Sequence, residues 1–352
     1  MAHVHVVIVG LCRRDDEPPI KRLFSYDDLK GSPVESQHAA LTPYLFDAGS
    51  VVNRHLVVEE TSRPLCPVPQ LVIGSKPIDD GNYIFDSEER EAFLARERGA
   101  RRYLRPYVGS EEFINGGERW ILHLADAAPE ELRALPLVRD RIAAVRTFRL
   151  ESKSASTRDL ARMPTRFHVT VVPGSPFLVI PEVSSERREY VPIGWLEPPT
   201  IPSNLVRALL GADLWHFGVL TSAMHMAWLR QIGGRLKSDY RYSIGIVYNT
   251  FPWPDASDAQ RMRIRALAQA ALDARREFPN STLADLYDPD VMPASLRHAH
   301  QRLDAAVDRL YRSQSFAGDR DRVEHLFGLY ETLVVPLVAA SRQRTRRAPR
   351  RT

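Results

Sequence analysis

Short apolar runs, broken by Gly, Pro, Asn and Asp, dominate the middle of the chain. Between residues 51 and 254 they read PQLVIGSKP, GNYIFDSEE, ERWILHL, FHVTVVPG and PFLVIPEV, and this segment holds most of the 26 prolines. Such punctuation predicts many short strands in antiparallel or mixed sheets. Helical spacing appears between them over residues 87–98 and 137–149. We therefore expect an α+β domain with several short strands over residues 51–254.

The pattern becomes helical after residue 255. Apolar residues recur every three or four positions in three stretches, which contain Ile264, Leu267, Ala268, Ala271 and Leu272, then Leu296, Leu303, Ala306, Val307 and Leu310, then Val323, Leu326, Phe327, Tyr330, Val334 and Leu337. Three amphipathic helices of this length form a small all-α helical bundle, which we place over residues 255–340. At the other end, VHVVIVG over residues 4–10 predicts one buried strand, followed by an irregular polar segment up to residue 50.

Composition restricts the class of protein. The chain is 44% apolar and 26% charged, as globular proteins are, and it has no run of 18 apolar residues that would cross a membrane. Its N-terminus lacks the features of a secretory signal, and its two distant cysteines exclude a disulfide framework. We therefore expect a cytoplasmic protein without membrane contact.

The basic pI of about 9.1 originates at the C-terminus. The last eleven residues, RQRTRRAPRRT, carry six arginines and no acid, so the net charge of +4 becomes −2 for the first 341 residues. Such a tail is typically solvated, and we expect residues 341–352 to be disordered. The chain also uses lysine sparingly, since only five of its 48 basic residues are lysines.

Common catalytic motifs are missing from the sequence. It contains no G-x-G-x-x-G, H-E-x-x-H, C-x-x-C or G-x-S-x-G. His216 and His225 are nine residues apart, which suits core or surface histidines better than metal ligands. Asp140, Glu151 and Lys153 imitate the carboxylate and lysine set of metal-dependent nucleases. The residues between the two carboxylates have helical spacing, however, which would separate them, so we consider this match accidental.

Residues 139–168 carry eight basic and three acidic side chains together with several hydroxyls. This mixture binds phosphate oxygens, so contact with a DNA backbone is one interpretation and a solvated helix face is the other. The candidates for backbone contact or loop support in this region are Arg149, Lys153, Arg158 and Arg162.

A second informative segment runs from residue 219 to residue 254. Helical spacing over residues 223–231 ends at two glycines, after which RLKSDYRYS precedes IGIVY, a predicted strand over residues 244–248. A loop rich in Arg, Lys, Asp and Tyr between a helix and a strand is suited to reading base edges. A charged surface loop with two stacking tyrosines is the alternative. The supporting candidates in this loop are Arg235, Ser238, Tyr240 and Tyr242.

Five segments together resemble the C-terminal part of the MmeI-like enzymes, single-chain restriction-modification proteins that methylate adenine in DNA. They are VHVVIVG, VPQLVIGSKPIDDGNYIFDSEEREAFL, YLRPYVGSEEFINGGERWILHL, HFGVLTSAMHMAWLR and GRLKSDYRYS…VYNTFPWP. These segments occur in the family's order and extend the resemblance to about residue 335. The resemblance implies the last methyltransferase strand and its exit linker over residues 1–50, a target recognition domain over 51–254 and a helical C-terminal domain over 255–340.

The resemblance also implies which parts of the enzyme are elsewhere. The nuclease, the glycine-rich cofactor motif and the Asn-Pro-Pro-Tyr/Phe motif that holds a flipped adenine do not occur in this sequence. We therefore expect no catalytic residue, no metal and no cofactor in these 352 residues, with S-adenosylmethionine and Mg²⁺ confined to the absent parent domains. The expected partner is double-stranded DNA.

The family reads one base pair next to the methylated adenine with two residues spaced two apart in the GRL-x-S-x-Y-R-Y-S motif. The matching positions here are Lys237 and Asp239. Lysine donates to guanine O6 and N7, and aspartate accepts from cytosine N4, so the pair should select G just 3′ of the adenine. Arg241 matches a family position that contributes to reading neighbouring bases.

The sequence leaves the biological arrangement open. The chain is either the specificity half of a split enzyme, whose catalytic half is a separate methyltransferase chain, or a truncated remnant. A different interpretation is an assembly module that binds a methyltransferase through its helical domain and contacts DNA weakly.

Overall fold

The computed structural model describes residues 9–26 and 31–347, which form two compact units. One unit consists of Met1–Val57 with Glu324–Thr352, and the other of Val58–Val323. Residues 4–8 of the predicted N-terminal strand lie outside the described residues. No helix among the described residues is long and apolar enough to cross a membrane.

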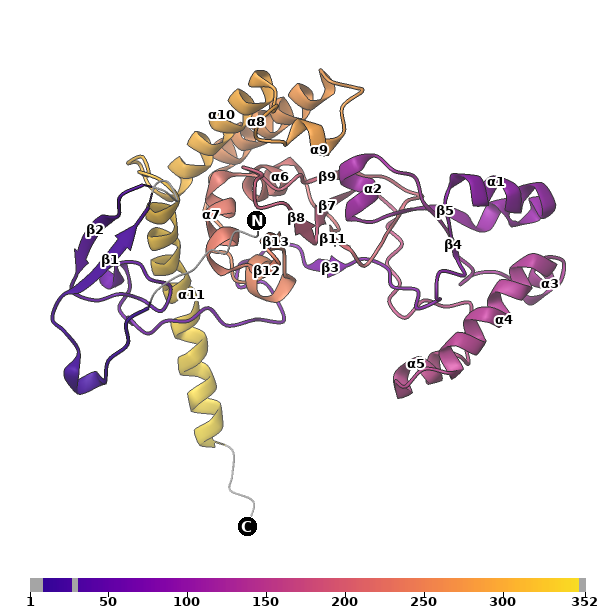
Figure 1. The fold of residues 1–352 in the computed structure, drawn as a ribbon, viewed down its shortest axis with the longest axis horizontal. Coiled ribbons are helices and arrows are strands. Elements are labelled where there is room, and N and C mark those ends of the chain that lie inside the picture. The colour runs from indigo at the N-terminus through magenta and orange to yellow at the C-terminus, as the bar shows by residue number, and fades with distance from the viewer. Residues whose placement is uncertain (1–8, 27–30, 348–352) are drawn as a thin grey trace, which may run out of the picture. The chain divides into compact units, whose positions relative to one another are not determined.

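The central sheet of the Val58–Val323 unit is antiparallel throughout (Figure 1). Its order is β3 (Leu71–Ile73), β11 (Val206–Leu209), β7 (Phe177–Pro181) and β9 (Gly194–Leu196), and Ala208 lies opposite both Val72 and Val179. Every residue of β7 is buried, which explains why its sequence is continuously apolar instead of alternating.

A second sheet has the order β10 (Ile201–Pro202), β5 (Leu104–Val108), β6 (Trp120–Leu122) and β4 (Ile84–Phe85). Helix α4 (Pro136–Leu150) joins the core of this sheet through the buried side chains of Val138 and Val145. The other elements around it are α1 (Ser87–Arg96), the 3-10 helix η3 (Arg98–Tyr103), α2 (Ser110–Asn115), α3 (Pro129–Arg133) and α5 (Ala155–Leu160). Both helices predicted between the strands, over 87–98 and 137–149, are therefore confirmed.

The third sheet carries the segment singled out by its polar residues. It has the order β12 (Gly234–Leu236), β13 (Asp239–Arg241) and β8 (Val183–Ser184). Strands β12 and β13 follow helices α6 (Leu214–Leu220) and α7 (Ala223–Ile232) in the chain, whereas β8 precedes them. The strand predicted over residues 244–248 is wrong: Ile244–Tyr248 is a π-helix, closed by a bond from the Asn249 N–H to the Ile244 carbonyl. Periodicity alone does not distinguish a buried strand from a buried helical turn in so short an apolar run.

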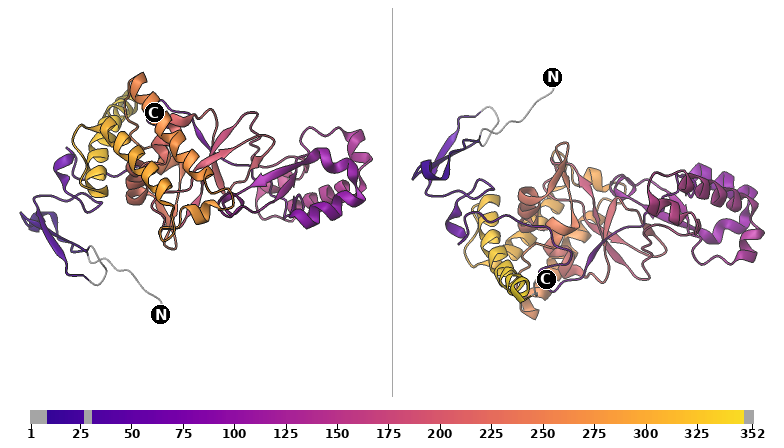
Figure 2. Two further views of the ribbon diagram at one scale, coloured as in Figure 1. Left: turned by 90° about the horizontal axis from the view of Figure 1, so that it is seen from above. Right: turned by 90° about the horizontal axis from the view of Figure 1, so that it is seen from below.

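The predicted helical C-terminal region is confirmed, and two of its three long helices pack on each other. Helices α8 (Asp258–Arg276) and α10 (Ala294–Tyr311) pack side by side, as the orange ribbons show (Figure 2), with the short α9 (Leu283–Leu286) between them in sequence and α11 (Asp319–Arg347) after them. The apolar stripes turn inward, since Ile264 and Ala268 on α8 and Leu303 and Val307 on α10 are buried. The fold class is thus an α+β domain of short strands followed by a small all-α region.

Two features of the other unit differ from the sequence prediction. The segment expected to be irregular contains a hairpin of β1 (Lys21–Ser25) and β2 (Val34–His38), whose residues are mostly exposed and show no apolar alternation. Helix α11 extends to Arg347, whereas disorder was expected from residue 341. Arg, Gln and Ala favour helix, and no Gly or Pro interrupts the chain between Pro336 and Pro349.

Candidate DNA interface

The strands β12 and β13 form a hairpin with a two-residue turn. Leu236 pairs with Asp239, so Lys237 and Ser238 form the turn, and both are exposed. Lys237 has a φ of 57°, in the left-handed region that residues with a Cβ rarely adopt. Two-residue hairpin turns need a positive φ at their first central position in either favoured type. The predicted loop is therefore a strand–turn–strand tip with Lys237 at its first position.

Arg235 and Tyr240 stabilise the hairpin from one side. The Arg235 guanidinium carbon lies 4.1 Å from the centre of the Tyr240 ring, and its Nη1 donates to the Ser238 carbonyl at 3.1 Å. The Tyr240 side chain is buried, while Ser238 is exposed at the tip. Of these three predicted supporting residues, Arg235 and Tyr240 hold the turn, and Ser238 is accessible from outside.

Asp239 begins β13 directly after the turn and is half-buried. One of its carboxylate oxygens, Oδ1, accepts a hydrogen bond from the backbone N–H of Glu186 at 3.3 Å. Glu186 belongs to the loop formed by residues 185–193, which joins β8 to β9. Because β8 is the neighbour of β13, this loop and the hairpin tip lie at the same end of the sheet.

Arg241 is the third predicted base-reading residue, and a carboxylate holds it by one edge. Its Nε and Nη2 atoms each lie 3.2 Å from Glu182 Oε1, and its side chain is 58% exposed. The same oxygen is 2.8 Å from Nη2 of Arg207, which is buried. This edge-on contact uses Nε and Nη2 and leaves Nη1 of the exposed guanidinium as a donor for guanine or phosphate oxygens.

Glu182 was not predicted as a functional residue. Its position inside the apolar run FLVIPEV was the available signal, because a charged residue within a buried strand segment needs a partner.

Tyr242 is enclosed in the protein. Its side chain is 1% exposed and its hydroxyl lies 2.8 Å from Nε2 of His225. Burial lowers the pKa of His225 to about 3 and raises that of Tyr242 well above its ordinary value, so both are neutral at pH 7. Of the two roles predicted for Tyr242, only support of the loop agrees with this environment.

Arg149 is also buried, with 0% exposure. Its guanidinium donates to six backbone carbonyls, those of Pro77, Ile78, Leu160, Met163, Pro164 and Arg166, at 2.8–3.3 Å. It therefore has no surface to offer a phosphate. Arg149 fastens two loops to α4, so the backbone-contact role predicted for it is wrong and the support role is the one the structure permits.

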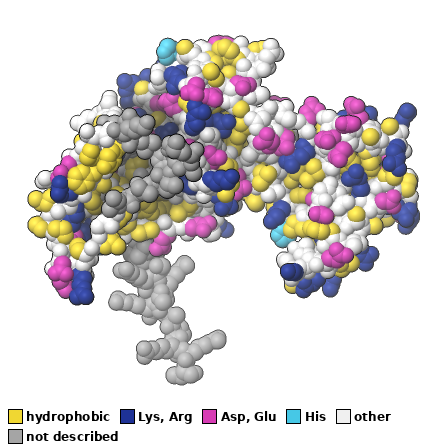
Figure 3. All heavy atoms as spheres, in the orientation of Figure 1, with side chains coloured by type: hydrophobic (Ala, Val, Ile, Leu, Met, Phe, Trp, Pro, Cys, Tyr) yellow, Lys and Arg dark blue, Asp and Glu magenta, His cyan; other side chains and the backbone are white. Residues whose placement is uncertain are grey.

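Lys153, Arg158 and Arg162 remain exposed at the end of α4 and along α5. Arg158 donates to the carbonyls of Ser152 and Lys153, and Arg162 lies 4.0 Å from Asp159. These cations lie in or next to α5, which follows α4 on the β5 sheet, whereas the hairpin belongs to the sheet of β8, so the two candidate regions are separate. On the face drawn in Figure 3, basic and acidic side chains are interspersed.

The nuclease-like match does not form a site. Asp140 lies inside α4 and Glu151 caps its C-terminal end, so the ten helical residues 141–150 separate the carboxylates. Among residues 9–26 and 31–347, no group of three or more His, Cys, Asp or Glu side chains is arranged to hold a metal ion.

Comparison with known proteins places the hairpin in a defined domain. Residues 52–255 match the family model for the target recognition domain of MmeI, and residues 256–338 match that for the MmeI C-terminal domain. The chain is 36% identical over 332 residues to DNA methyltransferase A of Bacillus subtilis (strain 168), with 94% of this chain and 36% of that protein covered.

A solved structure gives the same result. The type IIL restriction-modification enzyme MmeI in complex with DNA matches with a TM-score of 0.84 and 39% identity, over 91% of this chain and 42% of that one. The chain thus spans between a third and a half of the length of these relatives. It belongs to the MmeI family of restriction-modification proteins and comprises the family's target recognition and C-terminal domains.

Proposed function

We propose that this chain recognises a specific sequence in double-stranded DNA, as the specificity part of an S-adenosylmethionine-dependent adenine methyltransferase. The family assignment and the likeness to a DNA-bound enzyme support recognition of a DNA target. The observation that carries the proposal is the hairpin tip, which presents a lysine and a carboxylate two residues apart at an exposed turn.

Lys237 and Asp239 have the chemistry to read one base pair. A lysine ammonium donates to O6 and N7 of guanine, and a carboxylate accepts from N4 of cytosine, so together they favour one orientation of a G·C pair. Oδ1 of Asp239 is occupied by the Glu186 N–H, which leaves Oδ2 for the cytosine amino group. We expect the pair to select G on the methylated strand just 3′ of the adenine, with a discrimination of about 1–3 kcal/mol.

Contacts that lack sequence information complete the interface. Lys153, Arg158 and Arg162 are exposed cations, and we assign them to phosphate oxygens, which fix the register of a protein on the duplex. Arg241, anchored by Glu182, is assigned to a base neighbouring the one that Lys237 reads. Arg235, Tyr240, Tyr242 and Arg149 support the loops.

Catalysis is assigned to parts of the enzyme outside these 352 residues. The methyl donor S-adenosylmethionine, and Mg²⁺ for cleavage, would bind there, and no cofactor is assigned to this chain. A methyltransferase domain or a separate methyltransferase chain is then the second partner, which would present the adenine while the hairpin reads the adjacent pair.

The experiment is binding of the purified chain to two duplexes that differ only in the base pair 3′ of the adenine. The wild-type protein should prefer A-G to A-C by about 5–150-fold, the factor that corresponds to the expected discrimination. The double variant Lys237→Glu with Asp239→Arg exchanges donor and acceptor and should prefer A-C.

A matched control makes the same charge exchange elsewhere. Lys153→Glu with Asp159→Arg leaves the net charge unchanged and alters exposed residues at the other candidate region. It should weaken binding to both duplexes equally and keep the preference for A-G. If the hairpin variant keeps the wild-type preference, the assignment of Lys237 and Asp239 is wrong.

A further inference from the structure

The loop formed by residues 185–193 is attached to the C-terminal helical region at several points. Arg187 pairs with Asp290, Glu189 lies 2.6 Å from Arg297, and the Ile193 carbonyl accepts from Arg275 at 2.7 Å. This loop is also the one whose Glu186 N–H holds Asp239. The helical region therefore touches the element that orients a predicted base-reading carboxylate.

A further attachment of this loop is buried and involves a carboxylate on α10. The Tyr190 hydroxyl donates to Oδ2 of Asp304 at 2.6 Å, and the Tyr190 ring stacks on His300 with centroids 4.2 Å apart. Tyr190 is 2% exposed, whereas the Arg187–Asp290 pair is 60% and 70% exposed. Exposed ion pairs contribute little, so the buried Tyr190–Asp304 contact, together with the buried bond from Arg275 to the Ile193 carbonyl, fixes the loop.

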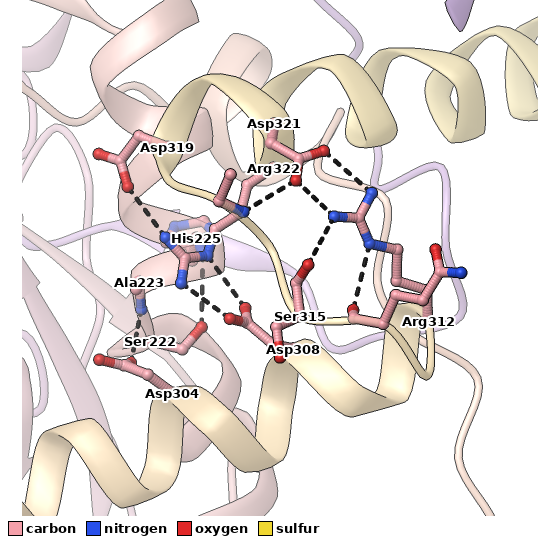
Figure 4. Close-up of polar contacts among 12 residues, drawn as sticks. Ser222, Ala223, His225, Asp304, Asp308, Arg312, Ser315, Asp319, Asp321 and Arg322 are labelled. Atoms are coloured by element: carbon pink, nitrogen blue, oxygen red, sulfur yellow. Dashed lines mark hydrogen bonds and ion pairs between the residues drawn. The ribbon is translucent and has the colours of Figure 1, made fainter.

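Asp304 has a second bond, to the other support of the hairpin. Its Oδ1 accepts from the backbone N–H of Ala223 at 2.7 Å, at the first turn of α7 (Figure 4). Helix α7 ends at Ile232, and only its capping residue, Gly233, lies between it and β12. A carboxylate at a helix N-terminus also interacts favourably with the helix dipole. Asp304 thus holds both the loop beside Asp239 and the helix that leads into the hairpin.

The surroundings of Asp304 favour a fixed arrangement. It is 8% exposed, and the neighbouring Asp308 is occupied by Arg322, with Nη2 and Nε at 2.8 and 3.0 Å. Burial raises the pKa of Asp304 to about 7, so the protein retains an acid at a position where desolvation disfavours its charge. Packing alone does not need such a residue, since a buried carboxyl is unfavourable unless its bonds are useful.

We propose that Asp304 is a positioning residue for base recognition, which sets the place of Lys237 and Asp239 by holding Tyr190 and the start of α7. On this view the helical C-terminal region contributes to sequence discrimination although it carries none of the base-reading side chains. The inference rests on the proposed function of the hairpin, and the test distinguishes a failure of the positioning role from a failure of that function.

The test compares three variants of the full chain. Tyr190→Phe keeps the ring on His300 and removes only the hydroxyl. Asp304→Ala removes both bonds, and Asp304→Asn preserves them, because its amide can accept from Ala223 N–H and donate to the Tyr190 oxygen. Tyr103→Phe is the matched control, since the Tyr103 hydroxyl at the end of η3 donates to Glu131 of α3 at 2.7 Å, in the part of the domain that contains the β5 sheet.

Two readouts decide the outcome. The first is amide hydrogen exchange without DNA, in which Tyr190→Phe and Asp304→Ala should accelerate exchange over residues 185–188 and 234–241. The second is the preference for A-G over A-C, which should fall at least about five-fold in these two variants. Asp304→Asn should match the wild type in both, and Tyr103→Phe should leave both unchanged.

Different results would overturn the positioning role of Asp304 and the assignment of the hairpin. Unchanged exchange at the hairpin in Tyr190→Phe would overturn the positioning role. An unchanged preference in that variant, in a protein whose wild type discriminates, would overturn it too. If the wild type shows no preference, the hairpin assignment fails, and the exchange data alone then decide whether Asp304 orders the hairpin.

Discussion

Replacing Arg149 with Met should reveal how much one buried guanidinium stabilises the recognition domain. Methionine has a similar length and fills the space, but it leaves six backbone carbonyls without their donor. Three of the lost bonds, from Nε and Nη2, are 2.8–2.9 Å long, and the three from Nη1 are 3.2–3.3 Å. A hydrogen bond to a charged group contributes about 1.5–3 kcal/mol, so the three short bonds alone predict a loss of roughly 4 kcal/mol or more.

The assay is urea-induced unfolding followed by tryptophan fluorescence, with limited proteolysis of the folded protein to localise the effect. In Arg149→Met the protease should cleave the two loops that Arg149 holds in the wild type, over residues 77–82 and 160–167. Arg146→Met is the matched control, because Arg146 lies one turn earlier on the same helix and is exposed. It should change the free energy of unfolding by less than about 0.5 kcal/mol. A loss below about 1 kcal/mol in Arg149→Met would refute the reasoning, and so would equal effects of the two substitutions.

Three further outcomes follow from other sites. Lys237→Gly should stabilise the turn by about 1 kcal/mol, because glycine adopts a positive φ without strain, while it abolishes the A-G preference in the duplex assay; lower stability would contradict the strained turn. Burial lowers the pKa of His225 and His300 to about 3, so their contribution to the free energy of unfolding is complete above pH 6.5 and is lost as the pH falls towards 3. The pKa of Asp304 is raised, so its contribution to the free energy of unfolding has the opposite sign and decreases as the pH rises from 4 to 7. The free energy of unfolding should therefore fall between pH 6 and pH 5 in urea titrations, and it should fall more steeply in Asp304→Asn, which lacks the opposing group; equal slopes would contradict these assignments. Glu331→Gln should accelerate amide exchange at residues 52 and 53, because the Glu331 carboxylate accepts hydrogen bonds from both of their N–H groups. Unchanged exchange would show that this contact does not protect the two amides.

The sequence predicted the elements whose burial follows a clear period. The α8 and α10 stripes, which include Ile264 and Leu303, lie inward as expected. The β1–β2 hairpin could not be found this way, because its residues are mostly exposed on both faces. The hairpin turn at Lys237 was likewise not visible as a turn, because KS lacks the Gly or Asn that usually marks a positive φ.

Arg149 shows where the charge pattern was misleading. By composition it looked like its neighbours Arg146 and Arg158, and all three were counted in one basic region. By position it lies four residues after Val145 and eleven after Val138, on the buried face of the same helix. The helical period therefore contained the signal that separates a structural arginine from a surface one. The carbonyls that it binds come from loops distant in sequence, which no local pattern reveals.

The unit formed by Met1–Val57 and Glu324–Thr352 has a consequence for the order of events during synthesis. Tyr44 and Phe46 are synthesised before Phe327, the aromatic side chain on which they pack, and the 266 residues of Val58–Val323 are made in between. At roughly 5–20 residues per second this interval is about 13–53 seconds. Throughout it, Tyr44 and Phe46 lack their native neighbour while the intervening unit is completed. The Val58–Val323 unit can thus fold on the nascent chain before Tyr44 and Phe46 meet Phe327.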